Sequence, residues 1–190
     1  HCVSVAVTAS TGIAATHING QTIHSWSGIG IKDELTHSDI TKLKKRKDIF
    51  RRITKTKVLI IDEISMIDAG LLDNVNKICQ AIRESDAPFG GLQVILTGDL
   101  FQLPPVSRSS LKLKFAVESE AWKQLGPVIC YLSGQHRQLD ADALLGILDA
   151  IRGGKATDDH LEILKTRFAS HHQNNFEDAT RLHSHNQDVD

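Results

Sequence analysis

The sequence predicts an α/β fold in which a parallel sheet is flanked by helices and followed by a mainly helical segment. Four short runs are rich in β-branched residues and show little polar–apolar alternation, which is typical of strands buried on both faces. An amphipathic stretch of helix length separates the second run from the third. Strands that alternate with helices favour parallel pairing through right-handed crossovers. The four runs are Val3–Thr8, Val58–Asp62, Leu92–Thr97 and Val128–Leu132.

Three helices are predicted from the spacing of apolar residues. The first covers Asp68–Glu84, where apolar residues recur at intervals of three and four and form one helix face. The second covers Asp140–Arg152 and ends at paired glycines, and the third runs from Asp158 to about Phe168. The polar stretch that follows is predicted as a loop, and Thr180–His183 is predicted to open another strand.

Length and composition limit the classes of protein to consider. With 190 residues and 41% hydrophobic content, the chain suffices for one domain and part of a second. Three scattered cysteines without a C-x-x-C pair support neither a disulfide framework nor a zinc ribbon. Neither a membrane-spanning run nor a signal-peptide pattern occurs. We therefore expect an intracellular protein without a membrane span, and since Met66 is the sole methionine, a chain that does not begin at its natural start.

The most specific chemical signal is an apolar strand that ends in two carboxylates, Asp62 and Glu63. In sheets that hydrolyse nucleotides, the first such carboxylate reaches a magnesium ion and the second faces the attacking water. Asp62 is predicted to hold Mg²⁺ through water, because this ion keeps several waters and takes few protein ligands. Glu63 is predicted to orient or deprotonate the water, a role that contributes about 10²–10⁴ in rate. Taken alone, the hexapeptide fits a buried strand with a solvated acidic turn equally well.

Three motifs in a fixed order strengthen the catalytic interpretation. They are Asp62-Glu63-Ile64-Ser65-Met66, Pro88-Phe89-Gly90-Gly91-Leu92-Gln93 and Gly98-Asp99-Leu100-Phe101-Gln102-Leu103-Pro104-Pro105-Val106. In this order and spacing they resemble the Pif family of superfamily-one DNA helicases, and RecD-like helicases share a looser version. The resemblance implies a RecA-like P-loop NTPase sheet and a monomeric, ATP-dependent 5′-to-3′ helicase that uses ATP and Mg²⁺.

The same resemblance implies partners and biological roles. Single-stranded DNA is the expected track, and duplex or structured DNA is the expected substrate. Roles in DNA repair, recombination and telomere maintenance are implied, with a location in the nucleus or mitochondrion of a eukaryote or the cytoplasm of a prokaryote. No membrane partner is expected.

Gln102 is the predicted phosphate sensor of the third motif. Its neutral amide can hydrogen-bond both a phosphate oxygen and a water, and Gly98 before it lets the backbone turn sharply beside a nucleotide. Pro104 and Pro105 are predicted to stiffen the exit toward bound DNA. Without the flanking motif, a solvated loop glutamine is the better interpretation.

The segment Thr8-Ala9-Ser10-Thr11-Gly12-Ile13-Ala14-Ala15, followed by Thr22-Ile23-His24-Ser25-Trp26, resembles the family's first DNA-contact motif. Small hydroxyl residues and a glycine after a strand expose backbone N–H groups that hold phosphates. The predicted DNA contacts are Thr8, Ser10, Thr11 and Gly12, with His24 or Trp26 stacking on a base. The alternative is an ordinary strand-to-helix turn capped by Ser10 or Thr11, with Trp26 in the core.

Positions 42–57 carry nine basic residues against one acidic residue, Asp48. Such a run is usually a solvated helix face. In helicases of this type a small wedge domain that meets the duplex junction is inserted here, so about 24–57 is predicted as a basic wedge region. Its predicted DNA contacts are Lys44, Lys45, Arg46 and Lys47. Binding through them is expected to weaken steeply with salt.

The segment Gln135-His136-Arg137-Gln138 resembles the family's fourth motif. Its arginine, Arg137, is predicted to reach the terminal phosphate, and such arginines contribute about 10³–10⁵ in turnover. No G-x-x-x-x-G-K-[ST] occurs, so the first strand and the P-loop are expected to be missing and the chain by itself to show little ATPase activity. Residues 1–135 are predicted to form a first motor domain without its P-loop, and 136–190 the start of a second.

Two other classes of function stay open from the sequence. A catalytically inactive remnant of a helicase would keep DNA binding alone, whereas a signal-transduction ATPase on the same sheet would bind no DNA. A metal site built from His171, His172, His183 and His185 is less favoured than a polar loop, because no carboxylate or cysteine lies at ligand spacing.

Overall fold

The computed structural model describes residues 3–30, 35–106, 114–132, 134 and 143–169. The chain divides into two compact units, His1–Cys130 and Tyr131–Asp190. Arg137, the four histidines at 171, 172, 183 and 185, the predicted loop after the last helix and the predicted strand Thr180–His183 lie outside the described residues. The predicted domain boundary between 135 and 136 stays a prediction.

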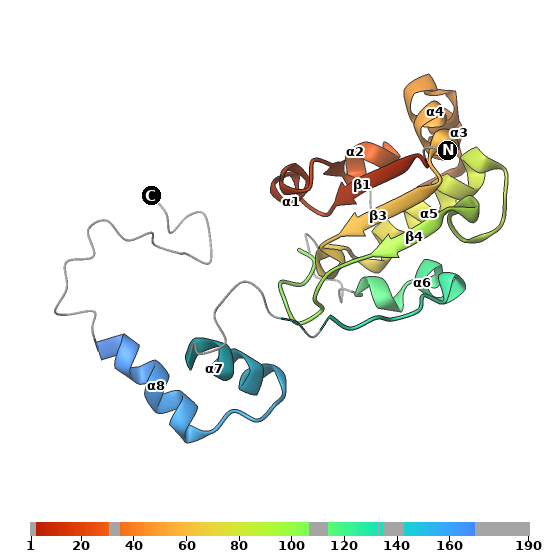
Figure 1. Ribbon diagram of the computed structural model, residues 1–190. Coiled ribbons are helices and arrows are strands. Elements are labelled where there is room, and N and C mark those ends of the chain that lie inside the picture. Colours follow the sequence, from red (N-terminus) through yellow and green to blue (C-terminus); the bar gives the residue numbers. More distant parts are fainter. Residues whose placement is uncertain (1–2, 31–34, 107–113, 133, 135–142, 170–190) are drawn as a thin grey trace. The chain divides into compact units, whose positions relative to one another are not determined.

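The first unit is built on a parallel sheet of four strands. These are β1 (Val5–Ala9), β2 (Gln21–Thr22), β3 (Val58–Asp62) and β4 (Gln93–Leu96), in the order β2-β1-β3-β4. Every neighbouring pair is parallel. Figure 1 shows β1, β3 and β4 side by side with their carboxyl ends together. The predicted parallel sheet is confirmed, and β3 has the predicted bounds.

The fourth predicted strand, Val128–Leu132, is wrong. These residues are extended chain without strand pairing, and Val128 is 90% exposed. A strand forms only where a neighbour accepts and donates its backbone hydrogen bonds, and no described strand of this sheet pairs with the run. An apolar, β-branched composition was therefore not sufficient to predict a strand here.

Helices and short 3₁₀ turns connect the strands. The first unit contains α1 (Gly12–His17), α2 (Ile23–Ser27), α3 (His37–Lys45), α4 (Lys47–Lys55), α5 (Ala69–Arg83), α6 (Glu120–Leu125), η1 (Ile64–Met66), η2 (Pro88–Gly91) and η3 (Ala116–Glu118). The second unit contains α7 (Ala143–Arg152) and α8 (Asp158–Ala169). The three predicted helices correspond to α5, α7 and α8, and the basic region forms α3 and α4. Within the described ranges no helix is long and apolar enough to span a membrane.

The core lies between the sheet and α5. Leu59 and Ile61 of β3 are fully buried in the same cluster as the apolar face of α5, and Figure 1 shows α5 passing behind β3 and β4. Asp68 starts this helix, because its carboxylate accepts a hydrogen bond from the Leu71 N–H at 2.8 Å. The buried face of α5 includes Leu72, Val75, Ile78, Cys79 and Ile82. This helix connects β3 to its neighbour β4, which is an edge strand of the sheet.

Candidate functional site

The order of the strands marks one place on the sheet for a ligand. From β1 the chain moves to β2 on one side, whereas β3 lies on the other side of β1. In open parallel sheets, ligands bind outside the carboxyl ends of the strands where the order reverses in this way. Thr11 follows β1 and Glu63 follows β3, so both lie at this point. The fold therefore directs these two predicted residues to the same edge.

A cavity of about 400 Å³ is present at this point, and we call it the carboxyl-edge cavity. It brings together Thr11, Glu63 and Gln102, which come from three separate predicted motifs. The remaining lining residues are Ile13, Ala14, His17, Ser65, Met66 and Leu103. Asp62 does not line this cavity, although it precedes Glu63 directly.

Asp62 is held by the end of the neighbouring strand. The Thr97 hydroxyl donates a hydrogen bond to its carboxylate. The Thr97 N–H donates to the Ile61 carbonyl at 3.0 Å, and the Ile64 N–H donates to the Thr97 carbonyl at 3.0 Å. The two backbone bonds hold Thr97 beside the end of β3, and its hydroxyl then fixes the Asp62 carboxylate. Sequence reasoning assigned no role to Thr97, because its partner lies thirty-five positions away.

Gly98 allows the close approach of these two strand ends. Its φ is +148°, and a Cβ at this position would lie 2.8 Å from the backbone nitrogen of Ile64. A side chain would thus meet rigid backbone beside the two carboxylates. The predicted sharp turn at Gly98 is confirmed in its geometry.

Glu63 adopts a left-handed backbone conformation, with φ 55° and ψ 49°. This conformation costs a non-glycine residue about 1–2 kcal/mol. It turns the chain from β3 into η1 and places Glu63 on the cavity wall. Strained backbone of this kind is found preferentially at functional sites.

Asp99 organises the turn that carries Gln102. Its carboxylate accepts the Phe101 N–H at 3.0 Å, and its carbonyl accepts the Gln102 N–H at 3.0 Å. The Gln102 Nε2 donates to the other Asp99 carboxylate oxygen at 3.4 Å. Gln102 itself is exposed and faces the cavity. Asp99 is thus a residue that positions Gln102. It belongs to the third motif, but the sequence alone did not indicate this role.

Ser65 is a further polar residue of the cavity that sequence reasoning missed. Its side chain is 1% exposed, and its hydroxyl has no hydrogen-bond partner among the described residues. A buried hydroxyl without a partner is costly, so its position on the wall fits a polar ligand or water in the cavity. In the sequence, the only indication of a role for Ser65 is that it belongs to the motif that starts at Asp62.

The predicted DNA contacts near β1 divide into buried and accessible residues. Thr8 is wrong as a side-chain contact, because it is fully buried and its hydroxyl donates to the Ile60 carbonyl at 2.7 Å. Stacking by Trp26 is wrong for the same reason, because this side chain is also fully buried in the core. His24 is half-buried.

Thr11 is the N-cap of α1, because its hydroxyl accepts the Ala14 N–H at 3.2 Å. Gly12 follows it and is exposed, whereas Ser10 is half-buried with a hydroxyl that no described residue binds. The turn is therefore both an ordinary capped helix start and an accessible surface. Contact of Ser10, Thr11 and Gly12 with DNA stays a prediction.

The basic residues lie elsewhere. Figure 1 shows α3 and α4 at the opposite end of the sheet from α1, where β3 begins. Lys44 forms an ion pair with Glu84 at 3.5 Å, and Arg46 pairs with Asp48 at 3.0 Å. The guanidinium of Arg46 lowers the pKa of the Asp48 carboxyl. Lys45 and Lys47 are exposed. The structure therefore separates this region from the carboxyl-edge cavity.

The carboxylates fit one type of metal ion. Within the described residues there is no group of three or more histidine, cysteine, aspartate or glutamate side chains that would enclose a metal. A structural zinc or calcium site requires such a set, whereas Mg²⁺ binds through one or two carboxylates with waters and phosphates. Asp62, fixed by Thr97, suits that sparse ligation.

The chain is similar to known helicases. The family model described as PIF1-like helicase matches residues 2–151. The chain is 49% identical to the ATP-dependent DNA helicase Pif1 of Psychrobacter sp. (strain PRwf-1), an alignment that covers 98% of this chain and 29% of that protein. It is 47% identical to the ATP-dependent DNA helicase RRM3 of Saccharomyces cerevisiae, over 86% of this chain and 22% of that protein.

Solved structures agree with these sequence matches. The crystal structure of Pif1 helicase from Candida albicans matches with a TM-score of 0.76 at 42% identity, over 83% of this chain and 35% of that chain. A Pif1 helicase from Bacteroides in complex with ADP-AlF3 and ssDNA matches with a TM-score of 0.76 at 35% identity, over 86% and 40% of the two chains. The chain thus spans less than a third of the length of the curated relatives given above.

Proposed function

Because this chain belongs to the PIF1-like helicase family, we propose that it supplies part of an ATP-dependent motor that moves along single-stranded DNA and unwinds duplex DNA. The observation that carries the proposal is the carboxyl-edge cavity at the reversal point of the sheet. Its lining includes Thr11 from the predicted DNA-contact motif and Glu63 and Gln102 from the predicted nucleotide motifs.

Each residue at this edge has a role that its chemistry permits. Asp62 would hold Mg²⁺ through water, and the ion would neutralise charge on the phosphates of ATP when bound. Glu63 orients the attacking water and accepts its proton. Gln102 hydrogen-bonds a phosphate oxygen or that water through its amide. Thr97 and Asp99 hold Asp62 and Gln102 in place. Arg137 is proposed to stabilise charge on the transferring phosphoryl group.

The shared cavity also supports coupling between the two ligands. Thr11 caps α1, and a shift of this helix on binding DNA would change the cavity that Glu63 and Gln102 also line. Ser10, Thr11 and Gly12 are proposed to hold DNA phosphates through hydroxyl and backbone N–H groups, with His24 beside them. Lys44, Lys45, Arg46 and Lys47 are proposed to contact DNA phosphates at the other end of the sheet.

Finer attributes belong to the same proposal. By family membership we propose 5′-to-3′ movement by a monomeric motor, an intracellular location, and roles in DNA repair, recombination and telomere maintenance. ATP and Mg²⁺ are the proposed cofactors. The reported neighbour in complex with ADP-AlF3 and ssDNA supports nucleotide and single-stranded DNA as ligands.

A chimera tests the proposed function. The chain would replace the aligned segment of the Psychrobacter relative, and ATP hydrolysis and unwinding of a forked duplex would be measured. We expect both activities, and we expect Glu63→Gln to reduce hydrolysis by about 10²–10⁴. Glu118→Gln, which changes a glutamate outside the cavity, is the matched control and should leave the rate unchanged.

Two results of the chimera experiment would count against the proposal. Hydrolysis that survives Glu63→Gln would remove the assigned role of this residue. An inactive chimera made from a chain that still binds single-stranded DNA would instead support the inactive, DNA-binding remnant.

A further inference from the structure

Helix α4 carries a row of cations beside an aromatic side chain. Lys47, Arg51 and Lys55 are exposed and recur every four residues, so they lie along one stripe of the helix. Phe50 and Thr54 lie beside this stripe on the flank next to the buried Ile49 and Ile53 face, and both are exposed. Across the described parts of the chain, none of the three cations has an ion pair or side-chain hydrogen bond.

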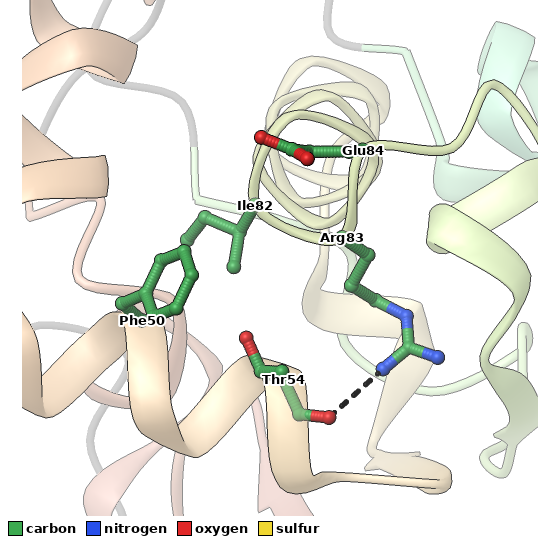
Figure 2. Close-up of a pocket in the computed structure, with 5 residues that line it drawn as sticks. All are labelled: Phe50, Thr54, Ile82, Arg83 and Glu84. Atoms are coloured by element: carbon green, nitrogen blue, oxygen red, sulfur yellow. Dashed lines mark hydrogen bonds between the residues drawn. The ribbon is translucent and has the colours of Figure 1, made fainter.

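Next to Phe50 is a cavity of about 330 Å³, which we call the Phe50 pocket. Phe50, Thr54, Ile82, Arg83 and Glu84 line it. Figure 2 shows the Phe50 ring and the Ile82 side chain turned toward each other, with Thr54 and Arg83 on the far side. Phe50 is 40% exposed to solvent, whereas Ile82 is buried. An aromatic surface is thus available to a ligand that enters from solvent.

The pocket is rigidly built, because Arg83 ties α4 to α5. The Arg83 Nε donates to the Gly90 carbonyl at 2.6 Å, and one terminal nitrogen donates to the Thr56 carbonyl at 3.1 Å. The same nitrogen approaches the carbonyls of Ile53 and Thr54 at 3.3 and 3.4 Å. These are carbonyls at the carboxyl end of α4, where a cation is favourable. A preorganised platform loses less entropy when it binds a ligand.

The charge around the pocket favours an anion. Glu84 is the acidic residue of the lining, and its carboxylate pairs with Lys44 at 3.5 Å. Asp48, on the same helix as the cationic row, pairs with Arg46 at 3.0 Å. Both carboxylates are therefore already compensated, whereas Lys47, Arg51 and Lys55 are not. The ligand that fits has a row of negative charges and a flat aromatic group.

We propose that the Phe50 pocket binds an unpaired base of single-stranded DNA by stacking on Phe50, while phosphates of the same strand lie along Lys47, Arg51 and Lys55. A stacking surface beside a cationic groove is how proteins bind single strands without sequence preference. The inference rests on the proposed function and adds a base-stacking site and a row of phosphate contacts to the basic surface already proposed at this end of the sheet. Phe50, Arg51 and Lys55 have not been assigned DNA contacts above.

The test measures affinity of the purified chain for a fluorescein-labelled oligothymidine by anisotropy, across a series of salt concentrations. We expect Phe50→Leu, which keeps an apolar contact with Ile82 but removes the ring, to weaken binding roughly 5- to 150-fold with an unchanged salt slope. Arg51→Gln should instead lower the slope of log affinity against log salt by about 0.7. Phe50→Tyr should retain the affinity of the original chain.

Three further measurements separate stacking from a change of fold. Phe115 is exposed to 39%, almost as much as Phe50, and lies outside the pocket, so Phe115→Leu should leave affinity unchanged. With an oligonucleotide of abasic sites in place of thymidines, Phe50→Leu should have no effect, because no base remains to stack. A 2-aminopurine in the strand should be quenched by the original chain and not by Phe50→Leu.

The outcomes distinguish this inference from the proposed function. If the chain binds the strand but Phe50→Leu and the original bind equally, the Phe50 pocket is not a base site and the DNA-binding function stands. If Phe50→Leu weakens binding to the abasic strand as much as to the thymidine strand, the effect is structural and the inference fails. If the original chain binds no single-stranded DNA at low salt, the inference fails, and the activity of the chimera decides the proposed function separately.

Discussion

Arg83 is predicted to be a main link between the basic helices and the sheet domain. Its guanidinium reaches four backbone carbonyls, of Ile53, Thr54, Thr56 and Gly90. Three of these belong to the end of α4 and the fourth to η2, which follows α5. Replacing Arg83 by alanine leaves the last carbonyls of α4 without this donor, so the end of this helix should loosen.

The magnitude follows from the geometry of these bonds. A net contribution of about 1.5–3 kcal/mol is usual for a hydrogen bond to a charged group. Only the bonds to Gly90 and Thr56, at 2.6 and 3.1 Å, are well formed, and the side chain is partly exposed. Two bonds at the lower end of that range give about 3 kcal/mol for Arg83→Ala. Arg83→Lys keeps the charge but not the planar guanidinium with its several donors, so it should lower the free energy of unfolding by about half as much.

Urea denaturation followed by far-UV circular dichroism measures these differences. Arg51→Ala is the matched control, because Arg51 is exposed and makes no ion pair within the described residues, so its free energy of unfolding should stay within about 0.5 kcal/mol. A change of less than about 0.5 kcal/mol for Arg83→Ala would refute the reasoning, since the two well-formed hydrogen bonds would then contribute no more than an exposed surface arginine.

Three further predictions concern single positions. Gly98→Ala should destabilise the chain by at least about 1–3 kcal/mol, because φ is +148° and the new Cβ would lie 2.8 Å from the Ile64 nitrogen. Gly12→Ala, at a position with open space for a Cβ and no left-handed φ, is the control in thermal melts. Asp68→Ala should lower the free energy of unfolding by about 0.5–2 kcal/mol, because it removes the N-cap of α5. Asp68→Asn should keep most of the original stability, since its amide oxygen can accept the same hydrogen bond. Equal stability of all three proteins would contradict the capping role of Asp68. Burial raises the pKa of the Cys79 thiol to about 12, so the folded chain keeps this thiol neutral near pH 8; mass spectrometry after iodoacetamide treatment should find Cys130 modified and Cys79 not, until urea unfolds the chain. Because this folded-state pKa lies above the ordinary value of 9.0, the corresponding stability is present below pH 9 and is lost as pH rises toward 12.

The predicted elements that the structure confirms depend on local pattern. The strand Val58–Asp62 is a continuous apolar run with a polar end, and α5 combines an apolar stripe with a capping aspartate. Both signals lie within fifteen or so neighbouring residues, the range over which periodicity and capping act. The association of Glu63 with Gln102 was also predictable, because the motif order places them after adjacent strands.

Other predictions depended on contacts that local pattern does not encode. Trp26 has an aromatic ring that could stack on a base, but it is buried in the core. Thr8 has a hydroxyl that could contact a phosphate, but this hydroxyl donates to the carbonyl of Ile60, fifty-two positions away. The run Val128–Leu132 has the composition of a strand, yet a strand also requires a pairing neighbour. Burial and pairing are properties of the assembled sheet, and sequence spacing alone leaves them open.

The sequence by itself determined the family, the parallel sheet, the helix that follows β3, and the two carboxylates at the end of that strand. Only the tertiary structure decided two contacts: the Thr97 hydroxyl donates to the Asp62 carboxylate, and the Arg83 guanidinium donates to a carbonyl at the end of α4. The physical reason is distance along the chain. Strand and helix formation are governed by neighbours a few residues apart, whereas the contacts that position Asp62 and build the Phe50 pocket join residues roughly thirty positions apart.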